Sequence, residues 1–247
     1  MMAHPQPDPS RGIFETMLVR RGEPVARDAH LSRLEASLEA VYGVGLPPGT
    51  PELVVGGAKG LELGRVRLTF VPGAGIEVES GEIDPALHFP EKPVSLRSHG
   101  VAGGLGCHKW ADRSALPPSS RREAAILVDG EEALEADRAN VFAVRKGALF
   151  TPPLDGRILP GVTRATTIEL ARAEGIETIE SVLTIEELRQ SEEVFLTNSI
   201  RGIEPVGSVD GEPLDAPGRM TLALRDGLRN AWESRTAAPK GGRSLTA

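Results

Sequence analysis

The segment that most constrains this chain is Ile158–Arg164, Ile-Leu-Pro-Gly-Val-Thr-Arg, which joins an expected strand to an expected helix. The strand covers residues 148–151, and the helix runs from Thr163 to Glu174, where Gly175 ends it. A Pro-Gly turn that leads straight into a helix leaves backbone N–H groups without partners at the helix N-terminus. These groups and the helix dipole favour an anion such as phosphate. The same pattern also suits an ordinary loop before a helix, so the segment alone does not identify a site.

The N-terminal part of the chain has the patterns of a small mixed lobe. Residues 14–20 alternate loosely and predict a strand, and residues 28–41 predict a helix that Asp28 could cap. Residues 65–71 and 75–79 predict a hairpin around a Pro-Gly-Ala turn. This part therefore indicates an α+β lobe that ends near residue 90. The apolar face of its helix consists of Leu31, Leu34, Leu38 and Val41.

The second half mixes strands with short helices. Residues 121–128 predict a short helix that runs into a strand, and residues 140–144 and 193–197 predict further strands. Thr184 and Glu187 have the spacing of a capping box at a helix start. Because strands and helices do not alternate strictly, the pattern indicates an α+β fold rather than a doubly wound parallel sheet.

Glycine-rich and polar stretches divide the chain. Four glycines between residues 100 and 106 indicate a linker or an active-site loop. The last residues are small or charged, which is typical of a frayed terminus. The expected organisation is a small N-terminal lobe over residues 1–98, a Gly-rich interdomain loop over 99–106, a large lobe over 107–236 and a flexible tail over 237–247.

Composition excludes several classes of function. The 247 residues carry a net charge of −7, which argues against general nucleic-acid binding. No run approaches about eighteen apolar residues, and the first residues lack the apolar region of a signal peptide, so we expect neither a membrane span nor export. The single cysteine, Cys107, rules out an intramolecular disulfide and suits the cytoplasm. No metal site is expected.

Six segments of the chain form a recognisable series: 12–17, 30–34, 107–109, Glu135 with 140–142, 159–164 and 194–206. In this order they resemble one enzyme family, the branched-chain aminotransferase-like or fold-type IV enzymes, which use pyridoxal 5'-phosphate (PLP). The family includes branched-chain aminotransferases, D-amino acid aminotransferases, (R)-selective amine transaminases and 4-amino-4-deoxychorismate lyases. The resemblance implies a two-lobed fold, with a small N-terminal α/β lobe, a larger C-terminal lobe built on a pseudo-barrel, and PLP in the cleft between them.

Lys109 is the expected catalytic residue. A PLP enzyme needs a lysine amine that holds the cofactor and moves a proton at the substrate carbon that carries the amino group. Lys109 alone among the chain's lysines lies between a Gly-rich loop and a tryptophan, a position that by itself also suits a surface lysine. The family resemblance implies the catalytic role. The lysines are Lys59, Lys92, Lys109, Lys146 and Lys240.

The resemblance implies a set of contacts to the cofactor. Glu135 corresponds to the carboxylate that pairs with the pyridine nitrogen and keeps it protonated, and Asn140 would support that pairing. Arg33 corresponds to the arginine that binds the phosphate, which needs a positive charge and short donors. The remaining expected contacts are Leu159 on the face of the ring, and Val162, Thr163 and Ser199 at the phosphate.

Substrate recognition is less determined by the motifs. Arg113 follows Lys109 in the order Lys-x-x-x-Arg, which resembles the deoxychorismate lyases, although Asp112 replaces their frequent asparagine and could pair with Arg113. Branched-chain aminotransferases usually have a tyrosine near position 114, whereas the only tyrosine here is Tyr42. The candidates for binding a substrate carboxylate or lying beside it are Arg97, His99, Arg113, Ile200 and Arg201.

Two reactions remain open at this point. The first is that of a 4-amino-4-deoxychorismate lyase, which releases pyruvate and 4-aminobenzoate for folate biosynthesis; residues 198–202 resemble these lyases. The alternative is a transaminase for D-amino acids or (R)-amines, because the spacing of Arg97 and His99 resembles the carboxylate-binding pair of D-amino acid aminotransferases. Both readings imply a small amino substrate that bears a carboxylate. Both also imply that the protein is a homodimer. A binding protein without catalysis is disfavoured by the intact pair of Lys109 and Glu135.

Overall fold

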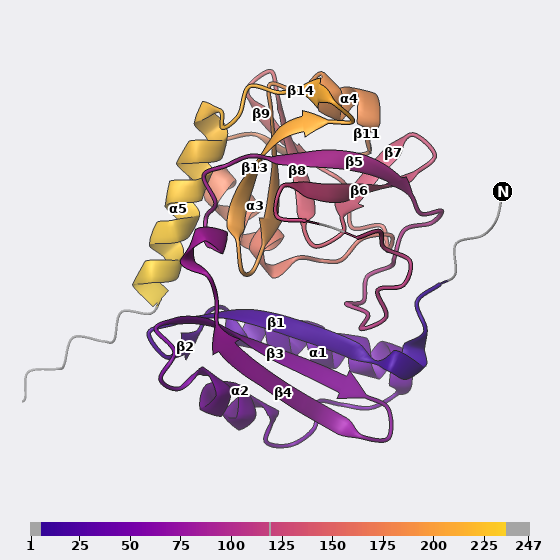
Figure 1. The fold of residues 1–247 in the computed structure, drawn as a ribbon, viewed down its shortest axis with the longest axis vertical. Coiled ribbons are helices and arrows are strands. Elements are labelled where there is room, and N and C mark those ends of the chain that lie inside the picture. Colours follow the sequence, from indigo (N-terminus) through magenta and orange to yellow (C-terminus); the bar gives the residue numbers. More distant parts are fainter. Residues whose placement is uncertain (1–5, 119, 236–247) are drawn as a thin grey trace, which may run out of the picture.

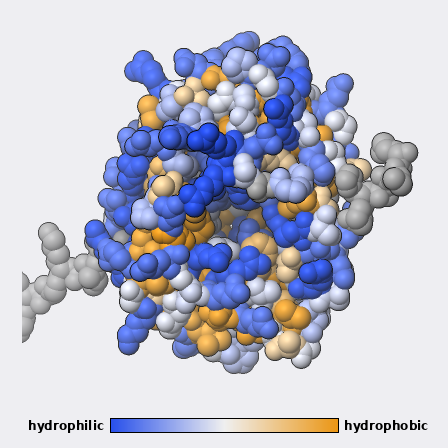
Figure 2. Space-filling model, viewed as in Figure 1, coloured by the Kyte–Doolittle hydropathy of each residue, from blue (hydrophilic) through white to orange (hydrophobic). Residues whose placement is uncertain are grey.

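The computed structural model describes residues 6–118 and 120–235, and these form two parts, one above the other (Figure 1). The smaller part is a four-stranded antiparallel sheet in the order β2-β1-β3-β4. The face of the whole molecule seen in Figure 2 is mainly hydrophilic, and hydrophobic residues gather beside a hollow near its middle. The strands are β1 (Ile13–Arg20), β2 (Glu23–Pro24), β3 (Leu63–Val71) and β4 (Gly75–Glu82), which confirms the expected strand and hairpin.

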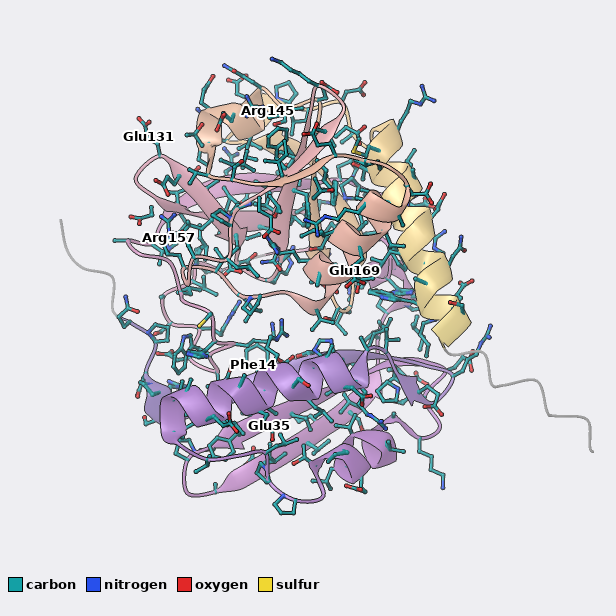
Figure 3. All side chains as sticks on the ribbon, turned by 180° about the vertical axis from the view of Figure 1, so that it is seen from behind. Phe14, Glu35, Glu131, Arg145, Arg157 and Glu169 are labelled. Carbon is teal, nitrogen blue, oxygen red and sulfur yellow. The ribbon has the colours of Figure 1, made fainter. Side chains whose placement is uncertain are left out.

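Two helices, α1 (Arg27–Tyr42) and α2 (Thr50–Ala58), cover one face of this sheet. The leucines expected on the apolar face of α1 are buried against β1 and β3. The expected cap at Asp28 is wrong, because α1 begins after Ala26, which has a left-handed backbone and makes no side-chain cap. Figure 3 shows Glu35 on the outer side of α1 and Phe14 at the level where the two parts meet.

A ten-stranded mixed sheet forms the larger part, in the order β10-β9-β8-β12-β13-β5-β6-β7-β11, with β14 beside β13. It begins at residue 94, so β5 crosses the boundary expected at residue 98. The bridge between Ala136 and Ala139 brings β7 close to β8. The strands are β5 (Val94–Gly100), β6 (Glu123–Asp129), β7 (Glu132–Ala136), β8 (Asn140–Arg145), β9 (Ala148–Thr151), β10 (Thr178–Glu180), β11 (Leu183–Thr184), β12 (Glu193–Asn198), β13 (Gly202–Val209) and β14 (Glu212–Pro213).

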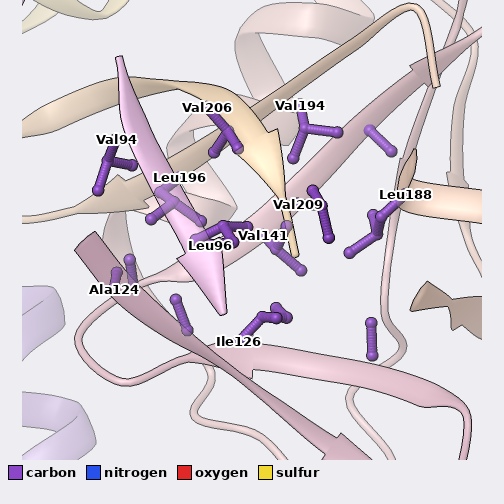
Figure 4. Packing of buried hydrophobic residues seen from close by; sticks show 14 of the residues in the cluster. Val94, Leu96, Ala124, Ile126, Val141, Leu188, Val194, Leu196, Val206 and Val209 are labelled. Atoms are coloured by element: carbon purple, nitrogen blue, oxygen red, sulfur yellow. The ribbon is translucent and has the colours of Figure 1, made fainter. Parts of the chain in front are cut away.

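Three helices accompany the large sheet: α3 (Val162–Ala173), α4 (Ile185–Arg189) and α5 (Arg219–Arg235). The expected capping box at the start of α4 is present. One core cluster lies within the sheet and includes Val94, Ile126, Val141 and Leu196 (Figure 4). A second cluster lies between the sheet and α3 and α5. Two short 3-10 helices, Pro9–Arg11 and Pro85–Leu87, precede β1 and β5.

The α+β fold class is confirmed, with one local correction. The short helix expected at the start of 121–128 is not formed; residues from Glu123 onward are a strand instead. The strand prevails because β6 pairs along one edge with β5 and along the other with β7, and these ladders use its backbone groups. Among the described residues, no helix is long and apolar enough to cross a membrane, and no cluster could hold a metal ion. The tail expected over 237–247 lies outside the described residues.

Candidate functional site

A pocket of about 650 Å³, partly open to solvent, lies where the two parts meet. Five places in the chain converge on it: α1, the segment around Trp110, the end of β7, the start of α3, and the end of β12 with the turn that follows it. All eight residues expected to contact a cofactor belong to its surroundings. Those that line it directly are Arg33, Lys109, Glu135, Asn140, Leu159, Val162, Thr163 and Ser199.

Lys109 is held in the pocket by the backbone around it. Its carbonyl accepts the N–H of Phe14 at 2.9 Å, and the next residue, Trp110, forms a β-bridge with Ile13. Burial and, to a smaller extent, the nearby Arg33 guanidinium lower the pKa of the Lys109 ammonium to about 8. A lysine with this pKa has an appreciable fraction of neutral amine near neutral pH, which is the form that acts as nucleophile or base.

Glu135 lines the same pocket as a buried carboxyl. It accepts the N–H of Leu159 at 3.2 Å, while the Asn140 amide lies 3.5 Å away and donates to the Leu159 carbonyl at 2.9 Å. Gly161 permits this arrangement, since a Cβ there would lie 1.9 Å from the Asn140 side-chain oxygen. Burial raises the pKa of Glu135 to about 7. A carboxyl poised in this way can take or return a proton to a basic group placed beside it.

Arg33 is fixed by three hydrogen bonds. Its Nε and Nη2 donate to the two carboxylate oxygens of Glu15, both at 2.7 Å, and its Nη1 donates to the Pro160 carbonyl at 2.9 Å. The Arg33 and His30 partners hold the pKa of the fully buried Glu15 at about 2, against the opposing effect of burial. The two parallel hydrogen bonds to Glu15 therefore fix the orientation of the Arg33 guanidinium beside the pocket.

The start of α3 faces the same pocket. Gly161 is the N-cap of α3, and no side chain caps the helix. Thr163 lies in its first turn, and the Thr163 hydroxyl is 3.5 Å from the Ser199 hydroxyl in the turn after β12. Uncapped N–H groups, two hydroxyls and the Arg33 guanidinium together form an anion site of the kind that the Leu-Pro-Gly segment predicts.

An outer pocket continues from the first and shares five lining residues with it: Lys109, Arg113, Arg138, Asn198 and Ser199. Five cationic side chains line this outer pocket, and among the described residues that line it none is acidic. The Arg67 guanidinium lies 3.8 Å above the Phe14 ring, and the Lys109 Nζ lies 4.7 Å from the centre of that ring. The lining consists of Phe14, Thr16, Arg67, Lys109, Arg113, Arg138, Asn198, Ser199, Ile200 and Arg201.

Arg113, Ile200 and Arg201, three of the expected substrate contacts, line the outer pocket. Arg113 donates to the backbone carbonyl of Asp137 and, within the described ranges, pairs with no carboxylate. Arg113 does not pair with Asp112, because the Asp112 carboxylate accepts the backbone N–H groups of residues 8 and 114. Arg201 does pair with a carboxylate, the buried Glu204, at 2.6 Å.

Arg97 and His99 do not line either of these pockets. Arg97 alternates along β5 with Leu96, whose side chain is in the core, so the Arg97 side chain points to solvent and pairs with Glu123 at 3.3 Å. The His99 Nε2 lies 3.1 Å from the Ala115 carbonyl. The described chain therefore does not bring these two residues to Lys109.

The motif analysis assigned no role to several ionisable residues of the site, among them Glu15, His30, Arg67 and Arg138. The first two lie in segments 12–17 and 30–34, so their position in matched motifs was an available signal. Arg67 alternates with the buried Val66 and Leu68 on β3, which places it on the face opposite the helices. Only the sheet pairing shows that this face looks into the pocket.

Comparison with known proteins finds similarity to aminotransferases. Residues 119–209 match the model of the family Amino-transferase class IV. The sequence is 32% identical over 258 residues to the D-alanine aminotransferase of Bacillus licheniformis, which covers 92% of this chain and 89% of that one. A shorter match, 49% identical over 72 residues, links it to the branched-chain-amino-acid aminotransferase of Escherichia coli; it spans 29% of this chain and 23% of that protein. A match with a relative from Methanocaldococcus jannaschii likewise spans only 40% of that protein.

The fold has equivalents among solved structures. The crystal structure of 4-amino-4-deoxychorismate lyase from Pseudomonas aeruginosa superposes with a TM-score of 0.72 at 24% sequence identity. The superposition covers 90% of this chain and 91% of that one. At this level of identity the likeness establishes the shared fold.

Proposed function

Because the chain belongs to the class IV aminotransferase family, whose fold-type IV members use PLP, we propose that it is a 4-amino-4-deoxychorismate lyase. The proposed reaction releases pyruvate and 4-aminobenzoate, a precursor for folate. The observation that carries the choice is the outer pocket, which is lined by five cationic side chains and, in the described chain, by no acidic one.

The residues of the deeper pocket fit the cofactor. An uncapped helix start, two hydroxyls and the Arg33 guanidinium suit a phosphate dianion. Glu135 is a buried carboxyl whose pKa is raised by burial, and a protonated pyridine nitrogen beside it would supply the opposite charge that favours the ionised carboxylate. Lys109 lines the same pocket and offers the amine. Thus Arg33, Val162, Thr163 and Ser199 would hold the phosphate, Leu159 the ring face, and Glu135 with Asn140 the ring nitrogen.

The cofactor, when bound, supplies an electron sink for the carbon that carries the substrate's amino group. Lys109 Nζ takes the proton from that carbon, and its pKa of about 8 leaves it sufficiently basic and sufficiently deprotonated to do so. In the lyase reaction the C–O bond to the enolpyruvyl group then breaks. The enolpyruvate leaves, gains a proton and becomes pyruvate, while the ring becomes aromatic.

The charge of the outer pocket favours a substrate with two carboxylates. 4-Amino-4-deoxychorismate carries one carboxylate on its ring and another on its enolpyruvyl group, whereas D-alanine carries one. Arg113 and Arg67 have no carboxylate partner within the described ranges, so both can bind substrate. A guanidinium binds a carboxylate through two parallel hydrogen bonds, which fixes orientation as well as position.

A transaminase for D-amino acids is the second candidate. The near full-length match with D-alanine aminotransferase favours it. Both candidates use the same cofactor contacts, and both imply a homodimer in which a neighbouring subunit completes the cleft. They differ in the substrate that the outer pocket must bind, which carries two carboxylates in the lyase reaction and one in the transamination of D-alanine.

Two assays on the PLP-loaded protein separate the candidates. The first measures 4-aminobenzoate released from 4-amino-4-deoxychorismate, and the second measures transamination between D-alanine and 2-oxoglutarate. We expect release of 4-aminobenzoate with one equivalent of pyruvate. Transamination of D-alanine without any 4-aminobenzoate would show that the lyase assignment is wrong.

A further inference from the structure

A chain of hydrogen bonds runs from the anion site to a buried carboxylate. The Thr163 hydroxyl is 3.5 Å from the Ser199 hydroxyl, which lies 3.1 Å from the Nε2 of His30. The other ring nitrogen of His30, Nδ1, lies 2.8 Å from a carboxylate oxygen of Glu15. His30 and Glu15 are each 1% exposed, so water cannot replace these partners.

The positions of the protons along this chain follow from Glu15. With a pKa of about 2, Glu15 is ionised and can only accept hydrogen bonds. The proton between Glu15 and His30 is therefore on Nδ1. In a neutral His30 the Nε2 atom is then an acceptor, so the hydrogen of the Ser199 hydroxyl must point to it.

A Ser199 hydroxyl that donates its hydrogen to His30 cannot also donate it to a phosphate. A phosphate dianion offers only acceptors, and a hydroxyl has a single hydrogen to donate. While the Ser199 hydrogen is given to His30, the oxygen of Ser199 presents lone pairs to any anion in the pocket. The conflict disappears if His30 becomes doubly protonated, because Nε2–H then donates to Ser199 and frees the hydroxyl hydrogen.

We propose that a phosphate dianion binds at the start of α3 with uptake of one proton from solvent onto the Nε2 of His30, which reverses the hydrogen bond between His30 and Ser199. His30 is thus a positioning residue for the phosphate site, acting through Ser199. The proposal rests on the PLP site of the proposed function. No covalent bond is made or broken apart from the N–H bond formed with the incoming proton.

The charges around His30 are consistent with this exchange. Glu15 from β1 favours its charged form, whereas Arg33 from its own helix, Lys109 from the segment before Trp110, and burial oppose it. In the cofactor-free protein burial dominates and lowers the pKa of His30, so the ring is neutral at neutral pH. An incoming dianion adds negative charge on the Ser199 side and shifts this balance toward the imidazolium.

Pyridoxamine 5'-phosphate is a suitable probe, because it carries the phosphate but no aldehyde and so does not react with Lys109. Calorimetry at pH 7.5 in buffers of different ionisation enthalpy gives the number of protons taken up per molecule bound. We expect the wild-type apo-protein to take up nearly one proton more than Ser199→Ala. The matched control is Thr163→Val, which also loses one hydroxyl of the phosphate site but leaves the contact of Ser199 with His30, and should keep the wild-type uptake.

Two further measurements locate the proton. The ³¹P chemical shift of the bound probe should remain that of a dianion; a monoanion would put the proton on the phosphate and overturn the proposal. His30→Gln places a permanent donor near Ser199, so the extra proton uptake should vanish while binding persists. Equal proton uptake by the wild type and Ser199→Ala would also overturn the proposal. Failure to bind pyridoxamine 5'-phosphate or PLP in any form would instead contradict the cofactor site itself.

Discussion

Replacing Arg33 by alanine should weaken cofactor binding and destabilise the cofactor-free protein at the same time. In the structure Arg33 has two functions, since one edge of its guanidinium binds the buried Glu15 and the side chain also lines the anion site. A charge-assisted contact contributes about 1.5–3 kcal/mol, so PLP affinity should fall about ten- to a hundredfold.

The stability effect can be worked out from Glu15. The pKa of Glu15 lies at about 2, below its ordinary value of 4.5. Burial raises this pKa, and the charge and hydrogen bonds of Arg33 and His30 lower it by more. A depression of this size corresponds to about 3 kcal/mol of stability, which is comparable to the cost of breaking a buried ion pair. For a chain of this length the loss lowers the melting temperature by about 6–12 °C.

The pH dependence gives the loss a distinctive form. Because the folded pKa of Glu15 is depressed, its stabilising contribution is present above about pH 4.5 and is lost as the pH falls toward about 2. The difference in melting temperature between the wild type and Arg33→Ala should therefore be large at pH 7 and shrink below pH 4.5. The His30 partner of Glu15 remains in the variant and limits the loss.

The assay combines titration of the apo-protein with PLP and thermal unfolding between pH 3 and pH 7. The control is Arg27→Ala on the same helix, whose exposed ion pair with Asp28 should contribute less than about 1 kcal/mol. Unchanged PLP affinity in Arg33→Ala, or a stability loss that is the same at pH 3 and pH 7, would refute the reasoning.

Five further outcomes are expected. Borohydride reduction of the yellow holoprotein should place the pyridoxyl group on Lys109 in peptide mapping; label on any other lysine contradicts the site. Because burial lowers the pKa of Lys109 to about 8, the rate at which apo-protein captures PLP should rise with pH through about 8 and level off above it, and a flat profile would contradict this. Glu135→Gln should retain PLP but lose most activity, and near-normal turnover would exclude its role at the ring nitrogen. Arg113→Ala should raise KM for 4-amino-4-deoxychorismate, with a loss of about 2–5 kcal/mol for a buried charged pair, whereas Arg97→Ala, outside the pockets, should not; equal effects would remove Arg113 from substrate binding. Light scattering should give a homodimer, and a fully active monomer would contradict that expectation.

The sequence by itself determined the local elements and the order of the motifs. The strand 148–151, the Pro-Gly turn and the helix at Val162 follow from short-range preferences, and the structure forms them within a residue of the expected limits. The hairpin of β3 and β4 likewise depends on a turn and on alternating residues nearby. Such features need only neighbours along the chain, so a sequence pattern is enough to predict them.

Only the tertiary structure decided which charged groups meet. Glu15 lies 15 residues before His30 and meets it because α1 packs on β1. His30 in turn reaches Ser199, 169 residues further along the chain, in the turn between β12 and β13. Residues 123–128 became a strand since two neighbouring strands offered hydrogen bonds that a single helical turn could not match.

The direction of each side chain was also a tertiary result. Arg97 was expected near the substrate, but the register of β5 puts Leu96 in the core and therefore turns Arg97 to solvent. Arg67 carried no motif, yet the register of β3 with β1 places it over Phe14 beside Lys109. In a strand, neighbouring side chains point to opposite faces, so sheet pairing and the packing of one face decide which arginine reaches the pocket.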